Sequence, residues 1–107
     1  MNRAAIVTIP RLLGARSSAR NLINSSIPKN TENVVLNAFE QESTAQGAAD
    51  EMIATLAKRN VDRVIVVNAT DTLVKHLKDS HKRRSRAKSL FILLFQNRNE
   101  EVLYREA

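Results

Sequence analysis

Strand-like apolar runs alternate with segments of helical spacing along the whole chain, and this alternation restricts the fold more than any other feature. The strand-like runs, rich in β-branched residues, cover residues 4–9, 33–39, 64–67 and 89–95, with a shorter one at 101–104. Helices are expected between them, at about 17–26, 43–59 and 71–88. The order β-α-β-α-β-α-β-β predicts an α/β fold, a four- or five-stranded, largely parallel or mixed sheet with three helices. The 107 residues suffice for one small domain, residues 1–107, but not for two.

Local signals place the ends of these elements. Ser17 or Ser18 is expected to cap the first helix, and Ser43 with Gln46 reads as a capping box for the second. The turn at 68–71 is expected to cap the third. The uninterrupted apolar run at 34–36 suits a strand that is covered on both faces. The second helix has an apolar face and an opposite polar side, made of Gln46, Asp50, Glu51, Thr55, Lys58 and Arg59.

The positive charge is concentrated in one segment. The chain has a net charge of +6, and residues 75–88 alone hold seven basic residues and one acid, Asp79. The basic residues are Lys75, Lys78, Lys82, Arg83, Arg84, Arg86 and Lys88. This segment is expected to be a basic helical extension. It is either a solvated helix end or a surface that binds nucleic acid, mainly through phosphates.

Several kinds of chemistry have no support in the sequence. The absence of cysteine excludes disulfides, thiolate metal sites and a thiol nucleophile. His76 and His81 are five residues apart, without carboxylates at ligand spacing, so neither a metal nor a cofactor is expected. Gly14 and Gly47 are the only glycines, so there is no glycine-rich phosphate loop. The apolar run 90–95 is too short to span a membrane, and a cytoplasmic, non-enzymatic protein is expected.

The candidate binding residues follow the strands. Asn37 and Asn68 end two strands, and Ser43, Thr44 and Thr70 lie in the turns that lead into helices. In open α/β sheets, ligands bind beyond the carboxyl ends of the strands, where helix N-termini favour anions. This edge of the sheet is therefore the expected contact for a partner or a small anion, although ordinary turn chemistry accounts for each residue by itself.

Residues 5–80 carry a resemblance to a known family. The strand Val-Val-Leu-Asn-Ala-Phe at 34–39, the helix start Gly-Ala-Ala-Asp-Glu-Met at 47–52 and the segment 60–69 resemble the STAS-like domains, small α/β proteins related to anti-sigma-factor antagonists. Leu13-Gly14 and Ser18-Ala19-Arg20 also fit the first helix of that family. The resemblance implies a regulatory module that docks on a protein partner through the strand ends and the start of the second helix, including Asp50. The class of partner that it implies is an ATPase or kinase-like regulator.

Two departures from the family pattern bear on the mechanism. Asn37 stands where the family has an acid, and Gly47 stands where antagonists have the serine that is phosphorylated. Ser43 and Thr44, just upstream, are candidate phosphorylation sites or simply the helix cap. The expected function is therefore a non-enzymatic protein-interaction module, and nucleic-acid binding through residues 75–88 is the alternative. A sheet edge near Tyr104 would also allow a homodimer.

Overall fold

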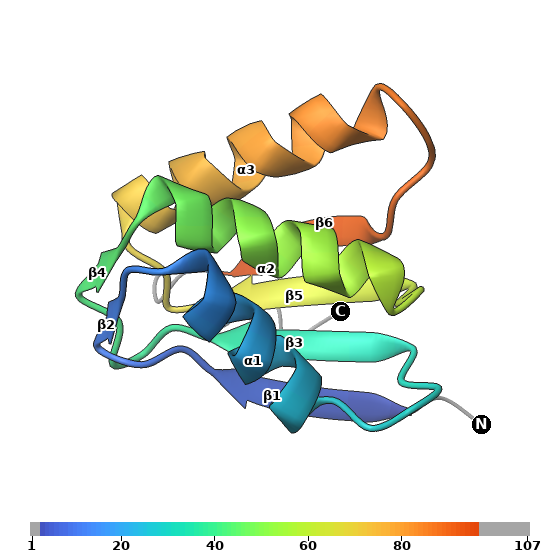
Figure 1. The fold of residues 1–107 in the computed structure, drawn as a ribbon, viewed down its shortest axis with the longest axis horizontal. Helices are drawn as coiled ribbons and strands as arrows, with labels where there is room; N and C mark the ends of the chain where they lie inside the picture. Colours follow the sequence, from blue (N-terminus) through green and yellow to red (C-terminus); the bar gives the residue numbers. More distant parts are fainter. Residues whose placement is uncertain (1–2, 97–107) are drawn as a thin grey trace.

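Four parallel strands and three helices form the body of the protein. The computed structural model describes residues 3–96, and it places all three helices on one side of the main sheet (Figure 1). The strands lie side by side in the order β1 (Ala4–Thr8), β3 (Asn33–Asn37), β5 (Arg63–Val67) and β6 (Ile92–Gln96). The helices between them are α1 (Arg16–Ser26), α2 (Gln46–Lys58) and α3 (Asp71–Ser85). A second, two-stranded parallel sheet pairs β2 (Leu12–Leu13) with β4 (Ser43–Thr44).

The expected α/β class and the three helices are confirmed, whereas the mixed sheet is not found within residues 3–96. Every strand pair described there is parallel, as expected when each strand is connected to the next through a helix. The short strand expected at 101–104 and the edge near Tyr104 lie outside the described residues. The β2–β4 pair was not predicted, because its residues were assigned to turns and to a helix cap.

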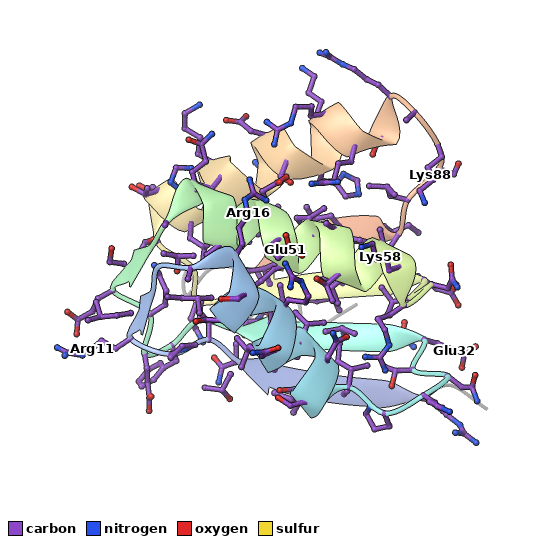
Figure 2. The ribbon with its side chains drawn as sticks, in the orientation of Figure 1. Arg11, Arg16, Glu32, Glu51, Lys58 and Lys88 are labelled. Carbon is purple, nitrogen blue, oxygen red and sulfur yellow. The ribbon has the colours of Figure 1, made fainter. Side chains whose placement is uncertain are left out.

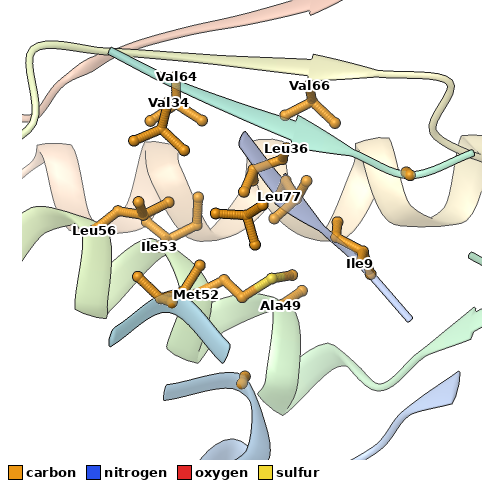
Figure 3. Close-up of a cluster of buried hydrophobic side chains, with 14 of the residues drawn as sticks. Ile9, Val34, Leu36, Ala49, Met52, Ile53, Leu56, Val64, Val66 and Leu77 are labelled. Atoms are coloured by element: carbon orange, nitrogen blue, oxygen red, sulfur yellow. The ribbon is translucent and has the colours of Figure 1, made fainter. Parts of the chain in front are cut away.

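The hydrophobic core lies between the sheet and the helix layer. Alternate residues of each central strand point toward the helices, so that Val34, Leu36, Val64 and Val66 are fully buried. Met52, Ile53 and Leu56 of α2 pack against them from the opposite side (Figure 3). The alanines of α2, Ala48 and Ala49, are also fully buried. Apart from the buried Phe91, the core of the described residues is therefore aliphatic, and it is centred on α2, which packs between α1 and α3.

The other face of the sheet is not covered by helices in the described part of the chain. The strand register aligns Ile6, Val35, Ile65 and Leu94 across all four strands. Ile6 and Leu94 are exposed, and Val35 and Ile65 are only partly buried. The strand at residues 34–36 was expected to be covered on both faces, but among the described residues helices cover only one of them. β-branched residues suit half-exposed strands as well as buried ones, so the apolar run did not distinguish the two cases.

The helix starts differ from the expected ones at α1 and α2. The residue that caps α1 is Ala15, and neither Ser17 nor Ser18 caps it. Ala45 caps α2, also without a side-chain hydrogen bond, because Ser43 is held in strand β4. Only the third cap is confirmed, since the Thr70 hydroxyl accepts a hydrogen bond from the Leu73 N–H. Within residues 3–96, none of the helices is both long enough and apolar enough to cross a membrane.

Candidate functional site

The carboxyl edge is the end of the sheet where the strands finish and the helices begin, and two of the predicted residues shape it. Asn37 ends β3, and its side-chain oxygen accepts a hydrogen bond from the Phe39 N–H at 3.1 Å. Asn68 follows β5 in the left-handed conformation, with φ 62°, and its N–H donates to the Gln96 carbonyl. Asparagine tolerates this backbone conformation better than most residues. Asn37 through its side chain, and Asn68 through its backbone conformation, therefore have structural roles in the turns they occupy.

A buried glutamine connects the other predicted residues of this edge. Gln41 is only 7% exposed, and its amide nitrogen donates to the Thr44 hydroxyl at 3.1 Å. Its amide oxygen accepts a hydrogen bond from the Thr70 hydroxyl at 3.2 Å. Thr44 and Thr70 are thus brought together through Gln41, a residue that the sequence analysis did not single out. This chain of hydrogen bonds fixes β4 against the start of α3.

Two large apolar side chains project from the carboxyl edge. Leu12 of β2 is 61% exposed and Phe39 is 63% exposed. Ser43, the exposed partner of Leu12 in the β2–β4 register, lies between the buried Thr44 and the loop that follows β3. Large exposed apolar side chains gathered at one end of a domain, with polar neighbours, are candidates for protein contacts. The edge therefore combines a fixed backbone with an apolar outer surface.

Asp50, the remaining predicted contact, lies at the meeting point of the three helices. Its carboxylate is 7% exposed and accepts hydrogen bonds from Arg16 of α1 at 2.8 Å, and from Arg83 and Arg84 of α3 at 2.7–3.0 Å. The Ser80 hydroxyl donates to the same carboxylate. The hydrogen bonds from Arg84 do most to hold the pKa of Asp50 far below its ordinary value. Burial alone would raise this pKa, but the hydrogen bonds from Ser80 and Arg16 lower it further. Asp50 therefore stays ionised and is not available to contact a partner directly.

Glu51 extends this group along the side of α2 that faces α1. Its carboxylate is 3.1 Å from Arg20 and 3.5 Å from Arg16 (Figure 2). The hydrogen bond from Arg20 is the main cause of its lowered pKa. The polar side of α2 that the sequence indicated is exposed at Gln46 and Lys58 but not at Asp50, Glu51 or Thr55. Asp50 and Thr55 are buried, because helices on both sides of α2 leave it little free surface. We call Arg16, Arg20, Arg83 and Arg84, with Asp50 and Glu51, the arginine cluster.

The basic segment 75–88 is divided between several roles. Arg83 and Arg84 belong to the arginine cluster, and Lys75 pairs with Asp79 one helical turn along α3. The Lys78 ammonium lies 5.4 Å from the centre of the Phe95 ring. Lys82, Arg86 and Lys88 have no acidic partner among residues 3–96. Arg84 is half-buried and the other basic residues of the segment are exposed, so the segment has a solvated basic surface from which Arg83 and Arg84 also reach Asp50.

One of the two histidines of the basic segment, His81, has a structural role. His81 is half-buried, and its Nε2–H donates to the Phe91 carbonyl at 2.7 Å. Its ring lies against the Phe91 ring, with a centroid distance of 5.1 Å. His81 therefore anchors the chain between α3 and β6. Residues 3–96 bring together no group of three histidine, cysteine, aspartate or glutamate side chains that would hold a metal ion.

The arginines of α1 were missed by the sequence analysis, although a signal was present. Arg16 and Arg20 are four residues apart and therefore share one face of α1, next to the buried Ala19 and Ile23. Adjacent acids, Asp50 and Glu51, on the next helix are natural partners for such a pair. Nothing in the sequence, however, shows that α1 and α2 pack side by side.

Comparisons with protein-family models, with curated proteins and with solved structures find no match to this chain. The functional interpretation therefore rests on the geometry described above and on the residue pattern.

Proposed function

We propose that this protein is a non-enzymatic regulatory module of the STAS-like type, which binds a protein partner through its carboxyl edge. The observation that carries the proposal is the exposure of Leu12 and Phe39 on this edge. The hydrogen bonds of the buried Gln41 with Thr44 and Thr70 hold the backbone of the same edge in place. A rigid surface loses little conformational entropy when it binds. The STAS-like resemblance of residues 34–39 and 47–52 points to an ATPase or kinase-like regulator as the class of partner.

The chemistry of the cluster agrees with a binding role rather than a catalytic one. Asp50 accepts hydrogen bonds from three arginines and a serine, so its carboxylate has no tendency to take up a proton near neutral pH. Asp50 contributes to docking indirectly, because it holds the starts of α1 and α2, which border the carboxyl edge, together with the last turns of α3. This differs from the direct contact that the resemblance implies.

If the module is switched by phosphorylation, Ser43 is the better of the two candidate residues. Ser43 is exposed, and no hydrogen bond to its hydroxyl is formed within residues 3–96. Thr44 is buried, and its hydroxyl accepts the hydrogen bond from Gln41. A phosphate on Ser43 would place a negative charge beside Leu12 and weaken apolar docking there.

The test is affinity capture from native lysate with matched variants of the tagged protein. Leu12→Gln removes an exposed apolar side chain at the carboxyl edge, and Ile92→Gln, at a residue 54% exposed on β6, removes one elsewhere. Each lysate is divided into nuclease-treated and untreated halves. We expect the wild type and Ile92→Gln to retain the same protein after nuclease treatment, and Leu12→Gln to lose at least about tenfold of it.

Two results would overturn the proposal. Equal capture by Leu12→Gln and wild type would exclude the carboxyl edge as the interface. Recovery that disappears with nuclease, and that falls when Lys82, Arg86 and Lys88 are changed to glutamine, would favour the alternative function of nucleic-acid binding through the basic segment.

A further inference from the structure

The arginine cluster contains more positive than negative charge. Arg16, Arg20, Arg83 and Arg84 are paired with only two carboxylates, Asp50 and Glu51, which leaves an excess of two positive charges. Asp50 is buried beneath the arginines, whereas the side chains of Arg16, Arg20 and Arg83 are each more than half exposed. The uncompensated charge therefore faces solvent on the outer surface of the helix layer (Figure 2).

The Asp50 carboxylate also orients the guanidinium groups of Arg16, Arg83 and Arg84. Arg16 and Arg84 donate to one oxygen of Asp50, and Arg83 and Arg84 donate to the other. Among residues 3–96, Arg83 donates only through one terminal nitrogen, and so does Arg16. A guanidinium has five N–H donors, so both groups keep several donors for a second anion. Asp50 thus holds like charges together that would otherwise repel each other, and their free donors remain accessible.

We propose that the arginine cluster is a binding site for a phosphate dianion. Two charges match the excess of the cluster, and tetrahedral phosphate oxygens accept the forked hydrogen bonds that guanidinium groups donate. A carboxylate would neutralise only half of the excess. The proposal does not depend on docking at the carboxyl edge, because it uses none of the edge residues.

Titration with inorganic phosphate tests the site directly. The arginine Nε–H resonances are followed by NMR at pH 7.5, with sodium chloride at matched ionic strength as the reference. We expect saturable shifts at Arg16 and Arg83 with a Kd of about 1–10 mM, since the site is open to solvent. A peptide with one phosphoserine, compared with its unphosphorylated form, distinguishes a phosphate on a protein side chain from free phosphate by its tighter binding.

Two neighbouring residues provide a matched pair of variants. Arg83→Gln removes one donor of the arginine cluster, while Lys82→Gln removes the same charge from a side chain that forms neither a hydrogen bond nor an ion pair with Asp50. In Arg83→Gln, Asp50 keeps its contacts with Arg16 and Arg84, so we expect this variant to fold. Its melting temperature checks this. We expect Arg83→Gln to weaken phosphate binding at least about fivefold and Lys82→Gln less than about twofold.

Three results would overturn the proposal. The first is the absence of saturable shifts up to 50 mM phosphate, a concentration about five times the upper expected Kd. The second is an equal loss of affinity in Arg83→Gln and Lys82→Gln, which would show only general charge attraction. The third is tighter binding of a short oligothymidylate than of phosphate, lost in Lys82→Gln rather than in Arg83→Gln, which would assign the charge to nucleic acid.

Discussion

Asp50 shows how one residue determines the arrangement of three helices. Its carboxylate on α2 binds Arg16 of α1 and both Arg83 and Arg84 of α3. Leaving a buried charge unpaired is costly, so these contacts favour one relative placement of the helices. At the same time the arginines are brought into a cluster whose outer side is free to bind. Stability and the proposed anion site therefore depend on the same residue.

We expect Asp50→Asn to destabilise the protein by about 2 kcal/mol. The change leaves three arginines facing one another without the carboxylate that neutralises them. The value is below that of a fully buried pair because the arginines are partly exposed. Urea unfolding measures it, with Asp79→Asn as the control, since the exposed Lys75–Asp79 pair should change stability by less than about 0.5 kcal/mol. Equal effects of the two substitutions would contradict this account.

The cluster also predicts a dependence of stability on acid. Asp50 and Glu51 have pKa values lowered in the folded state, so their contribution is complete above the ordinary carboxyl pKa, which is about 4. This contribution to the free energy of unfolding begins to decrease about one pH unit above the ordinary pKa, at about pH 5, and is lost progressively toward the folded pKa values. The urea midpoint should therefore decrease below pH 5 in the wild type and decrease less in Asp50→Asn. A midpoint that falls with the same slope in both proteins would show that Asp50 is not responsible.

At this scale, the sequence allowed only part of the site to be anticipated. Asp50 was identified as a functional residue, but as a direct contact on an exposed side of the helix. Arg16 and Arg20 were not identified at all. The reason is physical: a polar residue on α2 faces solvent or another helix depending on what packs beside it, and helical spacing contains no information about that neighbour.

Among the elements, the starts of the helices show which local signals succeed. The turn at 68–71 was expected to cap α3, and its residue Thr70 does so through its hydroxyl. Ser43 fits the capping-box pattern equally well, yet it forms β4 with Leu12, and α2 begins two residues after the strand ends. A pairing partner thirty residues away thus overrides a local cap. The same pairing places Leu12 and Ser43 together on the proposed docking edge.

Gly47 in the first turn of α2 provides a prediction for this element. Its backbone does not have a positive φ, and a Cβ there would lie 3.4 Å from the Arg16 Nε, an ordinary contact with a flexible side chain. Since alanine favours helix more than glycine, we expect Gly47→Ala to stabilise the protein by about 0.5 kcal/mol. Urea unfolding measures the change. Destabilisation by a similar amount would mean that Arg16 cannot adjust and that its position over α2 is rigid.

For the whole molecule, the alternation of strands and helices was enough to predict the α/β class and the number of helices. The sheet order β1-β3-β5-β6 follows from helical connections between neighbouring parallel strands. The uncovered face, with Ile6 and Leu94 exposed, did not follow, because a β-branched strand has the same pattern on a covered or an open sheet. Among the described residues, the carboxyl edge therefore lies between two different surfaces. One is the helix layer, and the other is the sheet face with the exposed Ile6 and Leu94.

Hydrogen exchange on the complex with the captured partner tests the central claim most directly. The backbone amides of residues 11–14 and 37–46 belong to the proposed docking edge, and those of residues 82–88 belong to the basic segment. The account predicts that binding slows exchange in the first two stretches and leaves residues 82–88 unchanged. Protection confined to residues 82–88, with no change along the carboxyl edge, would contradict it.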